Sequence, residues 1–279
     1  MTVLIAGCGD LGTEAGLRFA AAGHRVIGWR RSPGLLPDAI EGVSADLAGD
    51  LPAIPADTDI VVFAPAAGER TAETYRRVYL EGLTHVLDAL ERDGISPRRI
   101  LLVSSTAVNA DTDGAWVDES TPVEPPTETA GITYAMEQLL AARAPQGIVL
   151  RLSGIYGPGR TWLIDKVRNG STGDGPPRYT NRIHRDDAAA ALVHLATAVA
   201  DPAPVYLGVD EEPAPSTEVF AHLARQLGVA YEPGPAAAEP PTGKRLRGEL
   251  LRSTGFTFSY PTYREGYAAV LAGEGSRHP

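Results

Sequence analysis

The chain has 279 residues, of which 43% are hydrophobic and 22% charged, so it can bury a sizeable core and is not disordered throughout. A formal net charge of −10 argues against a nucleic-acid partner or an anionic membrane surface. The single cysteine, Cys8, excludes an internal disulfide and a cysteine-cluster zinc site, and we expect no metal. The longest apolar run, residues 188–200, is too short to cross a bilayer, and the first residues do not resemble a secretory signal. We therefore expect a cytoplasmic protein that acts on a small molecule, with a homodimer left open.

The first half of the chain alternates short apolar runs with segments of helical spacing. Strands are expected at residues 3–6, 24–29, 42–45, 59–64, 99–104 and 147–152, and helices at 11–22, 71–92 and 133–143. The strands are continuously apolar rather than alternating, which is typical of a parallel sheet covered on both faces. The pattern predicts an α/β fold: a Rossmann-like, doubly wound parallel sheet.

Beyond Tyr156 the composition changes. Glycine, proline and threonine cluster over 157–180. Proline and alanine cluster over 233–241, which we interpret as an exposed loop. Helices are expected at 186–199, 217–227, 244–253 and 263–271, and a strand at 205–209. We predict a dinucleotide-binding domain over residues 1–155 and a smaller substrate-binding region over 156–279, from which residues 183–209 return to the sheet.

Residues 7–12 read G-x-G-x-x-G between the first strand and the first helix. Such a loop needs glycine for a tight turn, for close approach of the backbone to a pyrophosphate, and for close packing of helix against strand. The N-terminus of the helix adds N–H groups and a positive dipole end. The candidate pyrophosphate-binding residues are Gly7, Gly9, Asp10, Leu11 and Gly12.

The end of the second strand indicates which nicotinamide cofactor is used. An NAD site has an acidic residue there that accepts hydrogen bonds from the ribose, but this chain has Arg30, Arg31 and Ser32. Two guanidinium groups and a hydroxyl suit a 2′-phosphate, so we predict that NADP(H) is preferred over NAD(H). Asp46, followed by Leu47, is placed to contact the adenine.

These features, with four further stretches, resemble the extended short-chain dehydrogenase/reductase superfamily, which includes nucleotide-sugar epimerases and dehydratases. The stretches are 61–64 (VVFA), 103–108 (VSSTAV), 154–159 (GIYGPG) and 182–187 (RIHRDD). The resemblance covers nearly the whole chain and is greatest to atypical extended members. It implies a nicotinamide cofactor that also contacts Ala64, Ser104, Ser153, Ile155 and Tyr156.

The family's catalytic set is a Ser or Thr after the fifth strand, a Tyr and a Lys spaced Y-x-x-x-K on the next helix, and often an Asn on the preceding helix. By the resemblance, the hydroxyl position is Ser105 and the Asn position is Tyr79. The Tyr and Lys positions fall on Thr129 and Thr133. The nearest tyrosine, Tyr134, has a glutamine in place of the lysine, and the first 165 residues contain no lysine.

Without that lysine, a family tyrosine keeps a pKa near ~10, so roughly one phenol in a thousand is ionised at pH 7, a penalty of about 4 kcal/mol. We therefore expect hydride transfer with proton delivery reassigned to another residue, to water or to the substrate. The catalytic candidates are Ser105 and Tyr134, and the substrate-site candidates are Thr106, Thr129, Thr133, Tyr79, Arg160 and His184. We expect residues 158–177, with Arg160 and Trp162, to overhang the nicotinamide pocket.

His184 is interpreted as a positioning residue, with Asp186 or Asp187 as the N-cap of the helix that follows. Two functions stay open. One is an NADP(H)-dependent oxidoreductase, epimerase or dehydratase acting on a small carbonyl or hydroxyl substrate. The other is a catalytically inactive protein that senses NADP(H).

Overall fold

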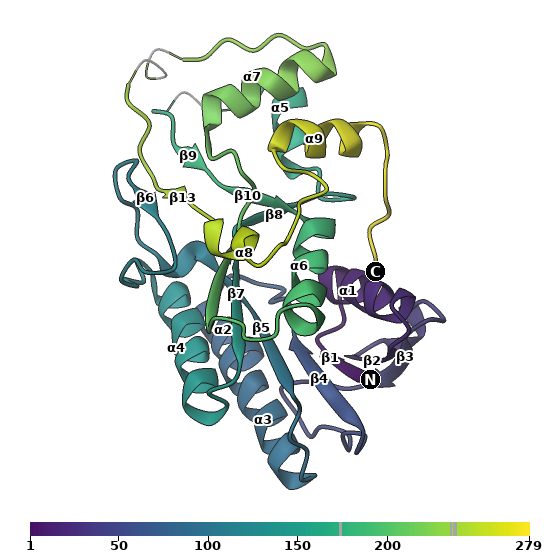
Figure 1. The fold of residues 1–279 in the computed structure, drawn as a ribbon. Coiled ribbons are helices and arrows are strands. Elements are labelled where there is room, and N and C mark those ends of the chain that lie inside the picture. Colours follow the sequence, from purple (N-terminus) through teal and green to yellow (C-terminus); the bar gives the residue numbers. More distant parts are fainter. Residues whose placement is uncertain (173–174, 235, 237–238) are drawn as a thin grey trace.

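The computed structural model describes residues 1–172, 175–234, 236 and 239–279. Its centre is a parallel sheet of seven strands in the order β11-β7-β5-β4-β1-β2-β3 (Figure 1). The strands are β1 (Thr2–Ala6), β2 (Arg25–Arg30), β3 (Glu41–Ser44), β4 (Thr58–Phe63), β5 (Arg99–Ser105), β7 (Ile148–Leu152) and β11 (Val205–Gly208). The chain reverses direction across the sheet between β1 and β4, where a doubly wound fold binds its ligand.

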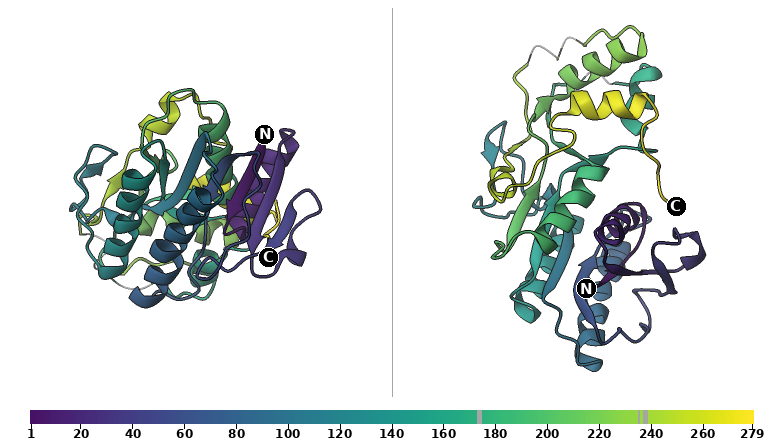
Figure 2. Two further views of the ribbon diagram at one scale, coloured as in Figure 1. Left: turned by 90° about the horizontal axis from the view of Figure 1, so that it is seen from below. Right: turned by 45° about the vertical axis from the view of Figure 1, so that its right-hand side comes forward.

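Helices cover both faces of this sheet, as the continuously apolar strands predict (Figure 2). On one face, α1 (Asp10–Ala21) and α6 (Arg185–Thr197) pack against the strands. The other face is covered by α2 (Ala72–Tyr75), a π-helical segment (Arg76–Glu81), α3 (Gly82–Arg92) and α4 (Glu128–Arg143). Successive residues of β5 serve the two layers, since Leu101 packs with the first and Leu102 with the second. Within the described residues, no helix has the length and apolarity needed to cross a membrane.

A second lobe lies beyond the carboxyl ends of the strands (Figure 1). Its core joins α5 (Trp162–Arg168), α7 (Ser216–Leu227) and α9 (Tyr263–Leu271). Three short strand pairs connect it to the sheet: β8 (Gly154–Tyr156) with β10 (Arg182–His184), β9 (Tyr179–Thr180) with β12 (Ala214–Pro215), and β6 (Trp116–Val117) with β13 (Arg245–Leu246). Within residues 183–209, β11 joins the main sheet beside β7, whereas β10 pairs with β8 outside it.

Some sequence-based boundaries are wrong. The helix expected from residue 133 begins at Glu128, because the side chain of Thr127 accepts the N–H of Ala130 and caps an earlier turn. The helix expected over 244–253 is only α8 (Glu249–Ser253), since β13 pairs with β6.

The Gly- and Pro-rich stretch 157–180, in which no helix was expected, contains α5. Residues 173–174 of this stretch, and residues 235, 237 and 238 of the expected 233–241 loop, lie outside the described residues. The sequence did not predict the short helix α5, because the glycines and prolines on either side of it dominate the composition of the stretch.

Candidate functional site: a dinucleotide and substrate cleft

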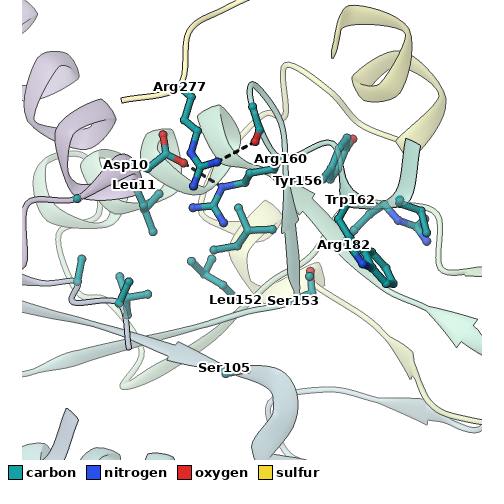
Figure 3. Close-up of a pocket in the computed structure, with 18 of the residues that line it drawn as sticks. Asp10, Leu11, Ser105, Leu152, Ser153, Tyr156, Arg160, Trp162, Arg182 and Arg277 are labelled. Atoms are coloured by element: carbon teal, nitrogen blue, oxygen red, sulfur yellow. Dashed lines mark hydrogen bonds and ion pairs between the residues drawn. The ribbon is translucent and has the colours of Figure 1, made fainter. Parts of the chain in front are cut away.

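A cleft of about 1210 Å³ lies between the carboxyl edge of the sheet and the second lobe (Figure 3). The loops after β1, β2, β4, β5 and β7 supply one side, and α5, α7 and α9 supply the other. The predicted site residues that line it are Gly9, Asp10, Leu11, Arg30, Ala64, Tyr79, Ser104, Ser105, Thr133, Ser153, Ile155, Tyr156 and Arg160.

The glycine loop has the geometry that a pyrophosphate requires. Gly7 has φ +88°, and a Cβ there would lie 2.5 Å from the backbone of Pro65. A Cβ on Gly12 would lie 3.0 Å from the carbonyl oxygen of Gly7 and from the Ile5 side chain, so α1 packs closely on β1. A Cβ on Gly9 would meet nothing within 4 Å, which leaves the cleft side of the loop open for a ligand. Gly7 therefore permits the tight turn, Gly12 permits close packing of α1 on β1, and the open side of Gly9 leaves room for a dinucleotide.

The negative charge of Asp10 at the start of α1 is compensated by two arginines. Its carboxylate lies 2.6 Å from Nη1 of Arg185 and 2.9 Å from Nε of Arg160, the second contact being visible in Figure 3. The backbone N–H of His278 donates to the same carboxylate at 3.1 Å. Because Arg185 is only 1% exposed, this pairing is fixed inside the protein. The neutralised carboxylate removes a charge that would repel a bound phosphate.

At the end of β2, only one of the two predicted arginines faces the cleft. Arg30 lines it and donates from Nη1 to the backbone oxygen of Pro279 at 2.8 Å. Arg31 and Ser32 are exposed and are not among the described lining residues. Asp46 is also absent from the described lining of the cleft. Its carboxylate accepts the N–H of Ala48 at 3.1 Å and so caps its own loop. Leu47, which follows Asp46, does not line the cleft either. The same is true of Gly7 and Gly12.

Hydroxyl groups gather where β5 meets α4. The Oγ of Ser105 accepts the N–H of Ala107 at 3.1 Å, so its own hydrogen can be donated to a ligand. Thr133, at the family's lysine position, donates to the carbonyl oxygen of Thr129 at 3.0 Å. Ser104 donates to Oε1 of Glu137 at 2.5 Å. The cleft therefore offers neutral hydrogen-bonding groups at the place where the family has an ionisable pair.

Behind Ser104, a buried ion pair joins β7 to α4. Arg151 donates to Glu137 from Nη2 at 2.7 Å and from Nε at 3.0 Å, and each side chain is 5% exposed. Glu137 thus accepts hydrogen bonds from the arginine and from the cleft serine together. This arrangement fixes the rotamer of Ser104 through a group that does not itself line the cleft.

The remaining sequence candidates lie elsewhere. Tyr134 is not among the described lining residues of the cleft; with Gln138 it lines a separate cavity of about 200 Å³ on the other side of α4. Thr106 and Thr129 are also outside the lining. Neighbouring positions on a helix point about 100° apart, which is why Thr133 and Tyr134 face different cavities.

His184 is buried at the start of α6. Its ring packs against Tyr260 at a centroid distance of 3.9 Å, and Nδ1 accepts the N–H of Asp186 at 3.3 Å. His184 is therefore the N-cap, and the expectation that Asp186 or Asp187 caps the helix is wrong. The carboxylate of Asp187 instead accepts two backbone N–H groups in the loop that leads to α9. Burial lowers the pKa of His184 to about 4, which keeps the ring neutral.

Sequence reasoning missed several residues that line the cleft. They include Arg70 and Tyr75 near α2, Arg182 of β10, Tyr267 of α9 and residues 277–279. The last segment descends from α9 to α1 (Figure 2), and Nη1 of Arg277 donates to the carbonyl oxygen of Gly159 at 3.0 Å. Arg182 stood inside the 182–187 motif, but the motif gave no indication of which side chains face the cleft.

The chain is similar in sequence and in structure to several known proteins. A 3-diazoavenalumate denitrifying reductase from a Streptomyces species is 31% identical over 280 residues, which span 90% of this chain and 88% of that protein. A protein from Methylobacillus flagellatus described as an NAD-dependent epimerase/dehydratase has a structure with TM-score 0.81 and 36% identity, with 97% of each chain covered. The NAD complex of a UDP-glucuronic acid 4-epimerase from Bacillus cereus shares the fold at TM-score 0.77 and 15% identity, covering 98% of this chain and 96% of that one. No family model matches the chain.

The fold, the glycine loop and these relatives define an enzyme of the oxidoreductase and epimerase class that uses a nicotinamide dinucleotide. The chain belongs to the NAD-dependent epimerase/dehydratase family, the extended branch of the short-chain dehydrogenases/reductases.

Proposed function

We propose that the protein is an NADP(H)-dependent reductase that delivers hydride to a small electrophile without a tyrosine–lysine proton relay. The observation that carries this proposal is the set of side chains where β5 meets α4. Ser105 and Thr133 present hydroxyl groups there, and no lysine is among the described residues that line the cleft. A reduced nicotinamide held at this edge of the sheet would supply the hydride. The Ser105 hydroxyl can stabilise a developing negative charge, whereas the Thr133 hydroxyl already donates to the carbonyl oxygen of Thr129, and neither replaces an ionisable acid.

The substrate that suits such a cleft carries its own electron sink. The Streptomyces relative is named for the reductive removal of nitrogen from a diazo compound, and we extend that chemistry to this chain. An arenediazonium ion that accepts one hydride forms a C–H bond and releases N₂, and the overall reaction consumes no proton. Reduction of a ketone needs a proton on the product oxygen, the step for which this cleft is poorly equipped.

The choice of NADP(H) rests on Arg30. Its guanidinium group lines the cleft at the end of β2, where an NAD-specific site would have a carboxylate. A 2′-phosphate bound here would share or displace the contact between Nη1 of Arg30 and the oxygen of Pro279.

Titration of NADPH and NADH into the wild type, Arg30→Ala and Arg31→Ala tests the cofactor. We expect NADPH to bind more tightly than NADH, and Arg30→Ala to lose about 1.5–3 kcal/mol of NADPH affinity, typical of a hydrogen bond to a charged group. Arg31→Ala is the matched control, because it removes the same charge from a side chain that does not line the cleft. Equal affinities for the two nucleotides, unchanged in Arg30→Ala, would refute the preference.

Single-turnover kinetics with NADPH deuterated at C4 test the chemistry. The panel is an arenediazonium salt, an aromatic aldehyde and an enone, each with an enzyme-free control. We expect a primary isotope effect and fastest reduction of the diazonium ion. Ser105→Ala should slow aldehyde reduction by roughly 10²–10³-fold, as expected for loss of an oxyanion donor, and should spare the diazonium reaction.

Tyr134→Phe should have little effect on any panel member, since Tyr134 faces the other cavity. Abolished turnover in that variant would contradict the assignment of roles. Tight binding of NADPH with no reaction above the enzyme-free rate would favour the alternative, a non-catalytic protein that senses NADP(H).

A further inference from the structure

One buried cation lines the cleft at the end farthest from the glycine loop. Arg182 belongs to β10, is 4% exposed, and is one of the residues that line the cleft beside α5 and α7 (Figure 3). A guanidinium group is rarely removed from water to this extent unless a carboxylate or phosphate partner compensates for it.

Neutral groups hold the Arg182 side chain in place. Its Nη2 donates to Oγ1 of Thr180, and its Cζ atom lies 5.0 Å from the ring centroid of Tyr263. Tyr267, from α9, lines the same part of the cleft. These contacts orient the cation without neutralising it.

One nitrogen atom of the guanidinium group has no partner among the described residues. The Nη1 atom of Arg182 is buried and forms no hydrogen bond with any described residue. The neighbouring Asp210 is buried too, but neither of its carboxylate oxygens forms a hydrogen bond with Arg182: Oδ1 accepts the N–H of Glu212 at 3.3 Å, and Oδ2 has no partner among the described residues. Burial raises the pKa of Asp210, which favours its uncharged form.

Aromatic and apolar side chains surround this end of the cleft. Trp162 of α5 is 72% exposed, an unusual position for so large an apolar surface, and Leu163, Val219 and Phe220 line the same region. The wall they form is suited to the flat face of an aromatic or conjugated ligand.

We propose that this end of the cleft binds an aryl carboxylate, with the carboxylate paired to Arg182 and the ring packed against Trp162 and Phe220. A carboxylate can accept from two guanidinium nitrogens at once, so it would satisfy the unpartnered Nη1. The inference rests on the proposed function in one respect: the bound acid is the molecule that accepts the hydride. It names the substrate class as aromatic or conjugated acids.

Calorimetric titration of trans-cinnamate and of its uncharged analogue cinnamamide tests the carboxylate site in the absence of turnover. With the wild type saturated with NADP⁺, we expect cinnamate to bind about 10–100-fold more tightly than the amide. Arg182→Gln should abolish that preference, and Arg182→Lys should retain part of it.

Two further variants separate charge from packing. Trp162→Ala should weaken acid and amide by the same factor, because it removes the wall and no charge. Lys166→Gln is the matched control for Arg182. The ammonium group of Lys166 lies 5.3 Å from the Trp162 ring centroid, so this variant removes a nearby cation and should leave the acid preference intact.

Equal affinities of the wild type for cinnamate and cinnamamide would overturn the inference. So would an acid preference that survives Arg182→Gln or disappears in Lys166→Gln. If Arg182→Gln does not fold, the wild-type preference together with Lys166→Gln decides the question. Selective binding of cinnamate without hydride transfer to any panel substrate would leave the carboxylate site standing and refute the proposed function. Hydride transfer to a panel substrate, without a preference for cinnamate over cinnamamide, would support the proposed function and refute the carboxylate site.

Discussion

The buried pair Glu137–Arg151 offers a sharp test of how the sheet, α4 and the cleft depend on one another. Glu137→Gln keeps the size of the side chain and removes its charge, which leaves Arg151 in a site where it is 5% exposed. Removing one partner of a buried ion pair costs about 3–5 kcal/mol, because the remaining charge stays desolvated. Ser104 also loses the charged acceptor of its 2.5 Å hydrogen bond.

The double variant Glu137→Leu/Arg151→Met should recover most of that loss, since replacing both members of a buried pair by apolar groups is often neutral. A control is available on the neighbouring surface. Glu91 lies 2.7 Å from Arg143, the same separation as the buried pair, but is 71% exposed. Glu91→Gln should therefore cost less than about 1 kcal/mol.

Urea denaturation followed by circular dichroism measures the free energy of unfolding for all four proteins. The reasoning fails if Glu137→Gln lies within about 1 kcal/mol of the wild type, or if the double variant is as unstable as the single one. Affinity for NADP⁺, measured in the same proteins, reports whether the serine side of the cleft is disturbed as well.

The glycine loop and Asp210 give two more predictions. Gly7→Ala should lower both the melting temperature and NADP⁺ affinity, because a Cβ would lie 2.5 Å from Pro65 at φ +88°, whereas Gly9→Ala should keep the stability and lose affinity. Thermal melts of both variants with and without NADP⁺ test this. Equal changes in melting temperature for Gly7→Ala and Gly9→Ala would contradict it. Burial raises the pKa of Asp210 from 3.8 to about 8, so the folded state retains a proton that the unfolded state releases. Stability should therefore fall between pH 4 and pH 8 in the wild type by up to about 1.4 kcal/mol per pH unit more than in Asp210→Asn. Parallel urea curves for the two proteins across this range would refute it.

Local patterns in the sequence were enough for the framework of the fold. Continuous apolar runs predicted the strands of the main sheet, and the G-x-G-x-x-G spacing located the loop after β1. Both depend on interactions within a few residues, such as the turn at Gly7 and the helix that begins at Asp10. The absence of lysine before residue 166 likewise needed no structure to be recognised, and it excluded the usual proton relay.

The tertiary structure decided which side chains share the cleft. Arg30 and Arg31 are adjacent and alike in sequence, yet only Arg30 lines it, because neighbouring residues at the end of a strand point in opposite directions. In the same way, the orientation of α4 directs Thr133 into the cleft and Tyr134 into the other cavity. Arg182 acquires its unpartnered atom only where β9, β10 and α9 converge. Contacts between residues far apart in the chain create such sites, and local sequence patterns do not predict those contacts.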